Sequence, residues 1–273
     1  MSDRLPSGEN VKSCCAAFYS SDWARLLLGD SFHPGGLTLT ERLGHLLGLR
    51  PGVRVLDVAS GKGSTSIFLA QRFGCEVVGI DYSAGLVAEA IQRAAVLGLA
   101  GKVRFEGGDA ERLPFVDASF DAIVCECAFC TFSDKPSAAV EFARVLRPGG
   151  RIGVADLTRS GSLPREMESI LAWVACLGDA RPIGEYVSLL REAGFAEPMA
   201  EAHDEALRDL ARDIRGKLLG AEFLAKIGKL GLPIGDIEQA KVMAKAAALA
   251  VDRGELGYSL LVAVRPGGGA VRW

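Results

Sequence analysis

Two acids and two glycines in one stretch of the chain are spaced as in a nucleotide-binding site. Asp57 lies near the end of a short apolar run at 53–58, and Gly61 and Gly63 follow in a turn of small residues. A second apolar run, at 75–80, leads into Asp81. Glycine has no Cβ, so the backbone at this turn can bend sharply and approach a ligand closely. A carboxylate after the second run can accept both hydroxyls of a ribose, and the stretch therefore predicts a nucleotide ligand.

A cluster of thiols lies at the end of a later apolar run. Cys125, Cys127 and Cys130 lie within residues 124–132, and Cys176 follows the next expected strand. The carboxyl ends of neighbouring strands in an open α/β sheet face one ligand crevice. We therefore predict that Cys127, Cys130 and Cys176 line one cavity and take part in the chemistry.

Four interpretations of these cysteines remain open on the residues alone. Buried cysteines are often small core residues. A zinc ion needs four ligands, and Cys176 or His33 could complete a set begun by the three local thiols. A redox-active thiol pair is a third interpretation. Three thiolates can also hold a soft ion such as trivalent arsenic.

His33 lies in a loop rich in turn residues, at 29–36, near the expected mouth of the crevice. Imidazole titrates near neutral pH, so this side chain could act as a general base for a hydroxyl or thiol nucleophile. A surface or capping role is the alternative. We expect structural roles for His45, on a helix, and for His203, at the end of a strand.

Short apolar runs alternate with helical patterns along the chain, and this order must position the residues above. The helical pattern at 64–73 directly follows the glycine turn. Strand, tight turn, helix and strand in this order form half of a nucleotide-binding α/β fold. We expect strands at 53–58, 75–80, 103–105, 119–124, 151–155, within 198–203, and at 258–264.

A glycine turn followed by an acid also suits a nicotinamide dinucleotide, but Ser66 replaces the third glycine of that fingerprint. Later motifs decide between the two ligands. The third run leads into GDAERLPF at 108–115, and RVLRPGG at 144–150 closes a helix before the fifth strand. The whole series over 50–156 resembles the class I S-adenosylmethionine-dependent methyltransferases.

This resemblance implies an α/β, Rossmann-like fold: a mostly parallel seven-stranded sheet with an antiparallel last strand. It implies S-adenosyl-L-methionine as the cofactor, with its methionine part at Asp57 and the 59–63 turn, its ribose at Asp81, and its adenine at Asp109 and the Ala110 amide. The sulfonium is already an activated methyl donor, so the protein mainly aligns a nucleophile with the methyl group. The residues assigned to the cofactor are Asp57, Ala59, Ser60, Gly61, Gly63, Asp81, Tyr82, Asp109, Ala110 and Cys125.

Two further segments resemble the arsenite methyltransferases within this class. Cys127 precedes Asp134-Lys135, and Cys176 opens a Cys-x-Gly-x-Ala segment ahead of Tyr186. The cysteine set is rearranged, because Ser66 stands where that family has a cysteine and no cysteine follows Cys176. The resemblance implies methyl transfer to a small soft nucleophile, such as a thiol-bound metalloid.

We divide the chain into an N-terminal helical cap at 1–50, a cofactor-binding core at 51–203, a helical insertion at 204–253, and a last strand with a tail at 254–273. In the cap we expect a helix pair broken near residues 20–22 and a helix at 37–49 that Thr38 or Thr40 caps. In class I methyltransferases such N-terminal segments lie over the cofactor, which would bring Cys14 and Cys15 to the crevice.

The composition suits a soluble globular protein. Of 273 residues, 49% are hydrophobic and 24% charged, and the net charge of −3 gives no basic footprint for nucleic acid. No apolar run approaches the roughly 18 residues that span a bilayer, and the start carries no secretory core. We expect a cytoplasmic monomer or homodimer with reduced thiols that takes a small-molecule substrate and binds neither nucleic acid nor membrane.

Three functional hypotheses remain at this point. The first is an enzyme that methylates a small soft nucleophile. The second is a module that binds the cofactor and a metal without turnover. The third is methylation of a small organic carbon, oxygen, nitrogen or thiol acceptor, with cysteines that are only structural. Acceptor pockets in this fold are built from variable segments, so the sequence leaves the acceptor open.

Overall fold

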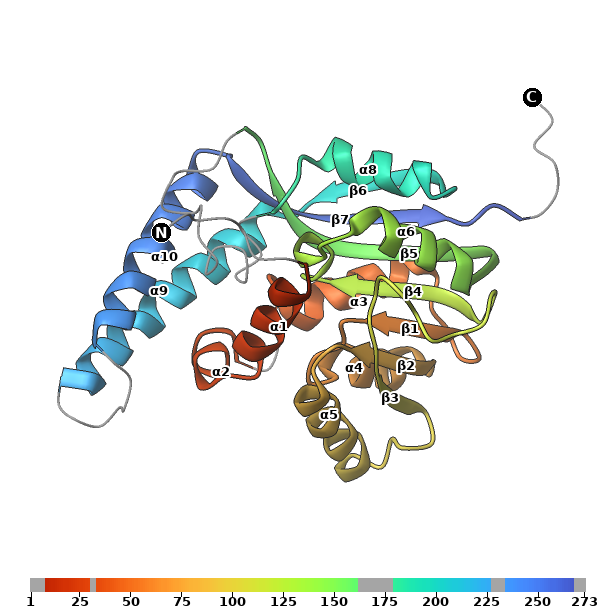
Figure 1. Ribbon diagram of the computed structural model, residues 1–273, viewed down its shortest axis with the longest axis horizontal. Helices are drawn as coiled ribbons and strands as arrows, with labels where there is room; N and C mark the ends of the chain where they lie inside the picture. Colours follow the sequence, from red (N-terminus) through yellow and green to blue (C-terminus); the bar gives the residue numbers. More distant parts are fainter. Residues whose placement is uncertain (1–7, 30–32, 162–178, 227–233, 268–273) are drawn as a thin grey trace.

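A seven-stranded sheet forms the centre of the molecule (Figure 1). The computed structural model describes residues 8–29, 33–161, 179–226 and 234–267. The strand order in the sheet is β3-β2-β1-β4-β5-β7-β6. The strands are β1 (Arg54–Val58), β2 (Glu76–Asp81), β3 (Val103–Gly107), β4 (Phe120–Glu126), β5 (Leu146–Arg159), β6 (Ala196–Ala202) and β7 (Leu256–Val264).

The pairing of these strands is mostly parallel. β1 pairs in parallel with β2 and β4, β2 with β3, and β4 with β5. Only β7 runs against its neighbours, β5 and β6, among the strands described. The predicted fold, a mostly parallel seven-stranded sheet with an antiparallel last strand, is confirmed.

Helices cover the sheet, and two pairs of helices lie at its carboxyl edge and beyond it (Figure 1). The described helices are α1 (Gly8–Tyr19), α2 (Asp22–Leu28), α3 (Gly36–Leu47), α4 (Ser64–Phe73), α5 (Ala84–Val96), the 3₁₀ turn η1 (Phe129–Thr131), α6 (Lys135–Val145), α8 (Ile183–Glu192), α9 (Asp204–Lys226) and α10 (Ile234–Asp252). α3 packs against α4 and β5, while α6 packs against α8 and β5. α9 packs along α10, and α2 contacts α9.

The turn between β1 and α4 depends on glycine. Gly63 is the N-cap of α4 and has a φ of 77°, in the left-handed region that favours glycine. A Cβ at this position would lie 2.4 Å from the Phe105 ring. The predicted helix at 64–73 therefore begins directly at the glycine turn, as expected.

Two expected boundaries differ from the structure. β5 begins at Leu146 rather than at 151, because Leu146 already pairs with Phe120 ahead of a bulge in the β4–β5 ladder. The N-cap of α3 is Gly35, with a φ of 73°, and no side chain caps this helix. The prediction that Thr38 or Thr40 caps it was wrong; the Thr40 hydroxyl instead turns inward and is fully buried. The expected break between the first two helices is confirmed, with the Ser21 hydroxyl capping α2.

The expected helical insertion is present as α9 and α10, which lie between β6 and β7 in the chain. They lie side by side and extend away from the sheet (Figure 1). Apolar side chains of both helices line a space that α1 and β7 also line. None of the described helices is long and apolar enough to cross a membrane. The division of the chain into four parts stays a prediction.

Candidate active site

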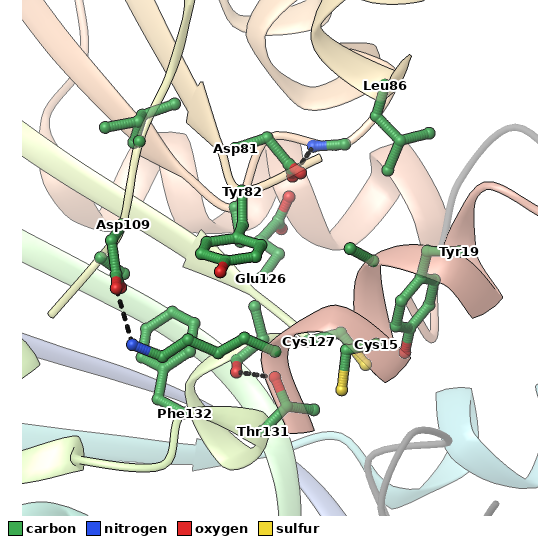
Figure 2. Close-up of a pocket in the computed structure, with 18 residues that line it drawn as sticks. Cys15, Tyr19, Asp81, Tyr82, Leu86, Asp109, Glu126, Cys127, Thr131 and Phe132 are labelled. Carbon is green, nitrogen blue, oxygen red and sulfur yellow. Dashed lines mark hydrogen bonds and ion pairs between the residues drawn. The ribbon is translucent and has the colours of Figure 1, made fainter. Parts of the chain in front are cut away.

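A cavity of about 830 Å³, including solvent at its mouth, lies at the carboxyl ends of β1, β2 and β4 (Figure 2). The structure brings six of the residues assigned to the cofactor to its wall, together with Cys127. The six are Ala59, Gly61, Asp81, Tyr82, Asp109 and Ala110.

The Asp81 carboxylate is held by the backbone on both sides of it. Its Oδ2 accepts a hydrogen bond from the Gly61 amide and its Oδ1 from the Ser83 amide, each at 2.8 Å. Burial raises the pKa of Asp81, and these two amides oppose that rise. Each carboxylate oxygen has further lone pairs, so the group is oriented to accept hydroxyl donors from a ribose.

Four other residues assigned to the cofactor do not line this cavity: Asp57, Ser60, Gly63 and Cys125. Asp57 is buried behind the wall, where its Oδ2 accepts a hydrogen bond of 2.5 Å from the Ser66 hydroxyl. Burial raises the pKa of Asp57 to about 8, and the charges of Glu126 and Asp81 add to the rise while Ser66 opposes it. Asp57 therefore lies within electrostatic reach of the site without reaching its surface.

Glu126, which the sequence reasoning did not single out, ends β4 at the cavity wall. Its side chain is only 4% exposed. The Thr65 hydroxyl donates to its Oε2 at 2.6 Å, and the Thr40 hydroxyl lies within 3.1 Å of both carboxylate oxygens. An acid at the end of an otherwise apolar strand, at the edge where ligands bind, is the sequence signal that could have identified it.

The predicted catalytic base, His33, is buried beside this carboxylate. Its Nε2 lies 3.4 Å from both the Glu126 Oε2 and the Thr40 hydroxyl, and its Nδ1 lies 3.3 Å from the Pro34 carbonyl oxygen. His33 is not among the residues that line either of the two cavities described here. A role as a base stays a prediction, and the geometry places His33 behind Glu126.

The predicted thiol cluster is divided by the structure. Cys127 lies on the wall, with a φ of 52° that turns the chain sharply after β4. Such a conformation is uncommon without glycine and is often found at functional sites. Cys125 and Cys130 are buried in the core instead, and burial raises the pKa of the Cys125 thiol well above its usual value. Cys176 lies outside the described residues.

No group of three or more histidine, cysteine or acidic side chains is placed to hold a metal ion within the described ranges. Cys125 and Cys127 are separated because β4 ends at Glu126, between them. A three-thiol site that includes Cys176 stays a prediction.

Helix α1 covers the cavity, as expected for the N-terminal segment. Lys12, Cys15, Ala16 and Tyr19 of this helix line it, and Figure 2 shows Cys15 and Tyr19 on the cavity side of α1. The Lys12 ammonium group pairs with Asp109 at 2.7 Å and with Glu111 at 2.5 Å. Of the two cysteines expected at the crevice, Cys15 lines the cavity, whereas Cys14 is not among the lining residues of either cavity.

A second, apolar cavity of about 940 Å³, also counted with solvent at its mouth, adjoins the first. Its lining comes from α1, α2, α9 and α10, from β5 and β7, and from Pro34 and Cys127 in loops. Leu210, Ala211, Ile214 and Leu218 of α9 form one side. Tyr19 and Cys127 line both cavities and therefore mark the place where the two spaces meet.

These features fit an S-adenosylmethionine site, and comparison with known proteins decides the family. Residues 49–194 match the methyltransferase domain family. The chain belongs to this family. The predictions of a class I methyltransferase and of S-adenosylmethionine as the cofactor are thereby confirmed.

Relatives in this family carry different names. The chain is 33% identical over 191 residues to phosphoethanolamine N-methyltransferase 3 of Arabidopsis thaliana, a match that covers 69% of this chain and 38% of the relative. It is 31% identical over 230 residues to the O-methyltransferase resE of Aspergillus sclerotiorum, covering 83% of this chain and 81% of the relative. The chain thus spans less than half the length of the plant relative.

The fold is similar to that of a solved geranyl diphosphate C-methyltransferase from Streptomyces coelicolor A3(2), in complex with Mg²⁺, geranyl-S-thiolodiphosphate and S-adenosyl-L-homocysteine. The TM-score is 0.74 at 17% identity, over 97% of this chain and all of that one (100%). This likeness shows the fold alone. The named relatives do not show the predicted arsenite branch.

Proposed function

We propose that this chain transfers the methyl group of S-adenosylmethionine to a small, mainly apolar organic acceptor. The observation that carries the proposal is the shared wall between the two cavities. Tyr19 and Cys127 belong to both the predicted cofactor cavity and the apolar cavity. A donor in the first and an acceptor in the second would therefore meet at these two residues.

The lining of the second cavity favours an apolar acceptor. The described residues that line it are leucine, isoleucine, valine, methionine, alanine, proline, phenylalanine, tyrosine and cysteine, and none of these described residues is charged. Burial of apolar acceptor surface in this cavity would stabilise the complex by about 25 cal/mol per Å². A charged acceptor would instead lose its hydration without gaining a partner in this space. An acceptor with a hydrocarbon body and one nucleophilic carbon, oxygen, nitrogen or sulfur atom suits this lining.

The chain's own contribution is to bind and align. When bound, S-adenosylmethionine supplies an activated methyl group. The apolar cavity would hold the acceptor, α1 would exclude water from above, and the Tyr19–Cys127 junction would bring the nucleophile in line with the methyl group. None of these roles requires a metal ion or a covalent enzyme intermediate.

The finer prediction of a metalloid acceptor has less support. A trivalent metalloid held by protein needs converging thiolates. Cys127 is on the shared wall, but Cys130 is 1% exposed and lies in the core. One of the relatives named above is a phosphoethanolamine N-methyltransferase, and the other is an O-methyltransferase. We therefore place the organic acceptor first.

The test is turnover with candidate acceptors. Purified chain, S-adenosylmethionine and a panel of apolar alcohols, phenols, amines, thiols and prenyl compounds would be incubated, and S-adenosylhomocysteine measured. We expect product with at least one apolar acceptor and none above background with arsenite and thiol. Turnover with arsenite alone would contradict the proposal.

A pair of variants tests the location of the acceptor. Ala211→Phe places a ring in the apolar cavity and should raise the acceptor KM at least tenfold while leaving S-adenosylmethionine affinity unchanged. Ala225→Phe is the matched control, because Ala225 lies on the same helix but does not line the cavity. Equal KM values for the two variants would place the acceptor elsewhere.

A further inference from the structure

Glu126 is a buried carboxylate whose hydrogen-bonding capacity is not filled by the described residues around it. Its contacts within the described structure are with Thr40, Thr65 and His33. The hydrogen bond from Thr65 and the approach of His33 are both to Oε2. Among the described residues, Oε1 has only the Thr40 hydroxyl, at 3.1 Å, and this single proton is shared with Oε2, at 3.0 Å. Because a carboxylate oxygen can accept two hydrogen bonds, Oε1 has spare capacity at the cavity wall.

The surroundings of this carboxylate are acidic. The charges of Glu126 and Asp81 both act on Asp57, and each raises the pKa of that buried acid. Asp109, in contrast, is neutralised by Lys12. In the part of the chain that the structure describes, no lysine or arginine forms an ion pair with Asp57, Asp81 or Glu126. Asp57 keeps its proton below about pH 8, so the negative charge at this end comes from Asp81 and Glu126. His33 approaches only the Oε2 atom of Glu126. A ligand cation beside these two carboxylates would be stabilised.

The cavity has two electrostatically different ends. Figure 2 shows Asp109 at one side of the cavity, and Glu126 next to Tyr82 and below Asp81. The ammonium group that pairs with Asp109 belongs to Lys12. The methionine part of the cofactor is assigned to the turn at 59–63, and that turn donates to Asp81. The methionine part carries an α-ammonium group with N–H donors and a sulfonium without any. A hydrogen-bond acceptor such as Oε1 therefore selects the ammonium group.

We propose that Glu126 binds the α-ammonium group of the cofactor, and that Thr40 and Thr65 hold the carboxylate in position for it. The proposal rests on the cofactor cavity but not on the nature of the acceptor. It assigns a binding role to the second residue of the CECAFC segment at 125–130, and this role is distinct from that of the two cysteines beside it.

The test is a thermodynamic cycle measured by calorimetry. Wild-type protein and Glu126→Gln would each be titrated with S-adenosylhomocysteine and with its desamino analogue, in which hydrogen replaces the amine. Removing a hydrogen bond to a charged group should weaken binding at least tenfold in the wild type. In Glu126→Gln the same change in the ligand should weaken binding less than threefold.

Asp109→Asn is the matched control. It removes an acid from the other end of the cavity, so it should weaken the binding of both ligands. The tenfold difference between the ligand with the amine and the ligand without it should remain. The proposal would be overturned if removing the amine from the ligand weakened binding by the same factor in the wild type and in Glu126→Gln. Equal binding of the two ligands by the wild-type protein would also overturn the proposal. This outcome can be measured even if the variants do not fold. Wild-type protein that binds neither ligand would overturn the cofactor cavity itself and, with it, the proposed function.

Discussion

The Lys12 ammonium group of α1 lies 2.7 Å from the Asp109 carboxylate after β3, although 97 residues separate them in the chain. The same ammonium group reaches Glu111. A second contact joins the Ser20 hydroxyl to the Ser83 hydroxyl at 3.0 Å. The N-terminal helices are thus tied by polar contacts to the rim of the cavity, at the acid predicted to bind adenine. We expect cofactor exchange to require that these contacts open.

Loss of the Lys12 contacts should speed cofactor exchange. Lys12→Met keeps the length of the side chain but removes its charge, so α1 loses its pairing with Asp109 and Glu111. We expect S-adenosylhomocysteine to dissociate several-fold faster in stopped-flow measurements. Arg212→Met is the control, because it removes a largely exposed ion pair on α9; such pairs contribute little. A dissociation rate equal to that of the wild type would show that α1 does not limit exchange.

Asp81→Ala should weaken cofactor binding strongly. The variant removes the acceptor for ribose hydroxyls and also the anchor of the Gly61 amide in the glycine turn. Hydrogen bonds to a charged group contribute about 1.5–3 kcal/mol each. We expect the S-adenosylmethionine Kd to rise at least tenfold by calorimetry. An unchanged Kd would mean that the ribose lies elsewhere.

Asp57 should make folding stability depend on pH. Burial, with the charges of Glu126 and Asp81, raises its pKa to about 8, from 3.8 for an unperturbed side chain. Between about pH 4 and pH 8 the folded protein keeps a proton that the unfolded chain has released, so stability falls as pH rises through this window. The slope from this one group is at most about 1.4 kcal/mol per pH unit.

Asp57→Asn should remove that slope. Urea unfolding at pH 5, 6, 7 and 8 would compare the wild type with this variant and with Asp209→Asn, a control at an exposed position. We expect the wild type and the control to lose stability relative to Asp57→Asn as pH rises. Parallel pH profiles for all three proteins would show that Asp57 is ionised in the folded state.

Cys127 distinguishes the two acceptor classes. If it is only part of the shared wall, Cys127→Ala should keep S-adenosylmethionine affinity and retain methylation of an apolar acceptor within about tenfold. Loss of a metalloid ligand would instead abolish turnover. The measurement is the rate of S-adenosylhomocysteine formation at saturating acceptor. Complete loss of activity with intact cofactor binding would favour the thiol chemistry predicted for Cys127, Cys130 and Cys176.

The sequence alone predicted the order of the strands and helices along the chain. The apolar runs predicted the strands, and the glycine turn predicted where α4 begins, because φ values and periodicity are properties of adjacent residues. Asp81 could be placed at a strand end for the same reason. The family motifs then indicated the cofactor, since those motifs are contiguous segments.

Only the tertiary structure decided which side chains meet. Glu126 contacts Thr40 and Thr65 across separations of 86 and 61 residues, and no linear pattern encodes that contact. The thiols illustrate the same limit: Cys127 and Cys130 are neighbours in sequence, but a backbone turn puts one on the wall and the other in the core. Which neighbours face a cavity depends on how helices far away in the chain pack over the strand ends, and here α1, α9 and α10 decide it.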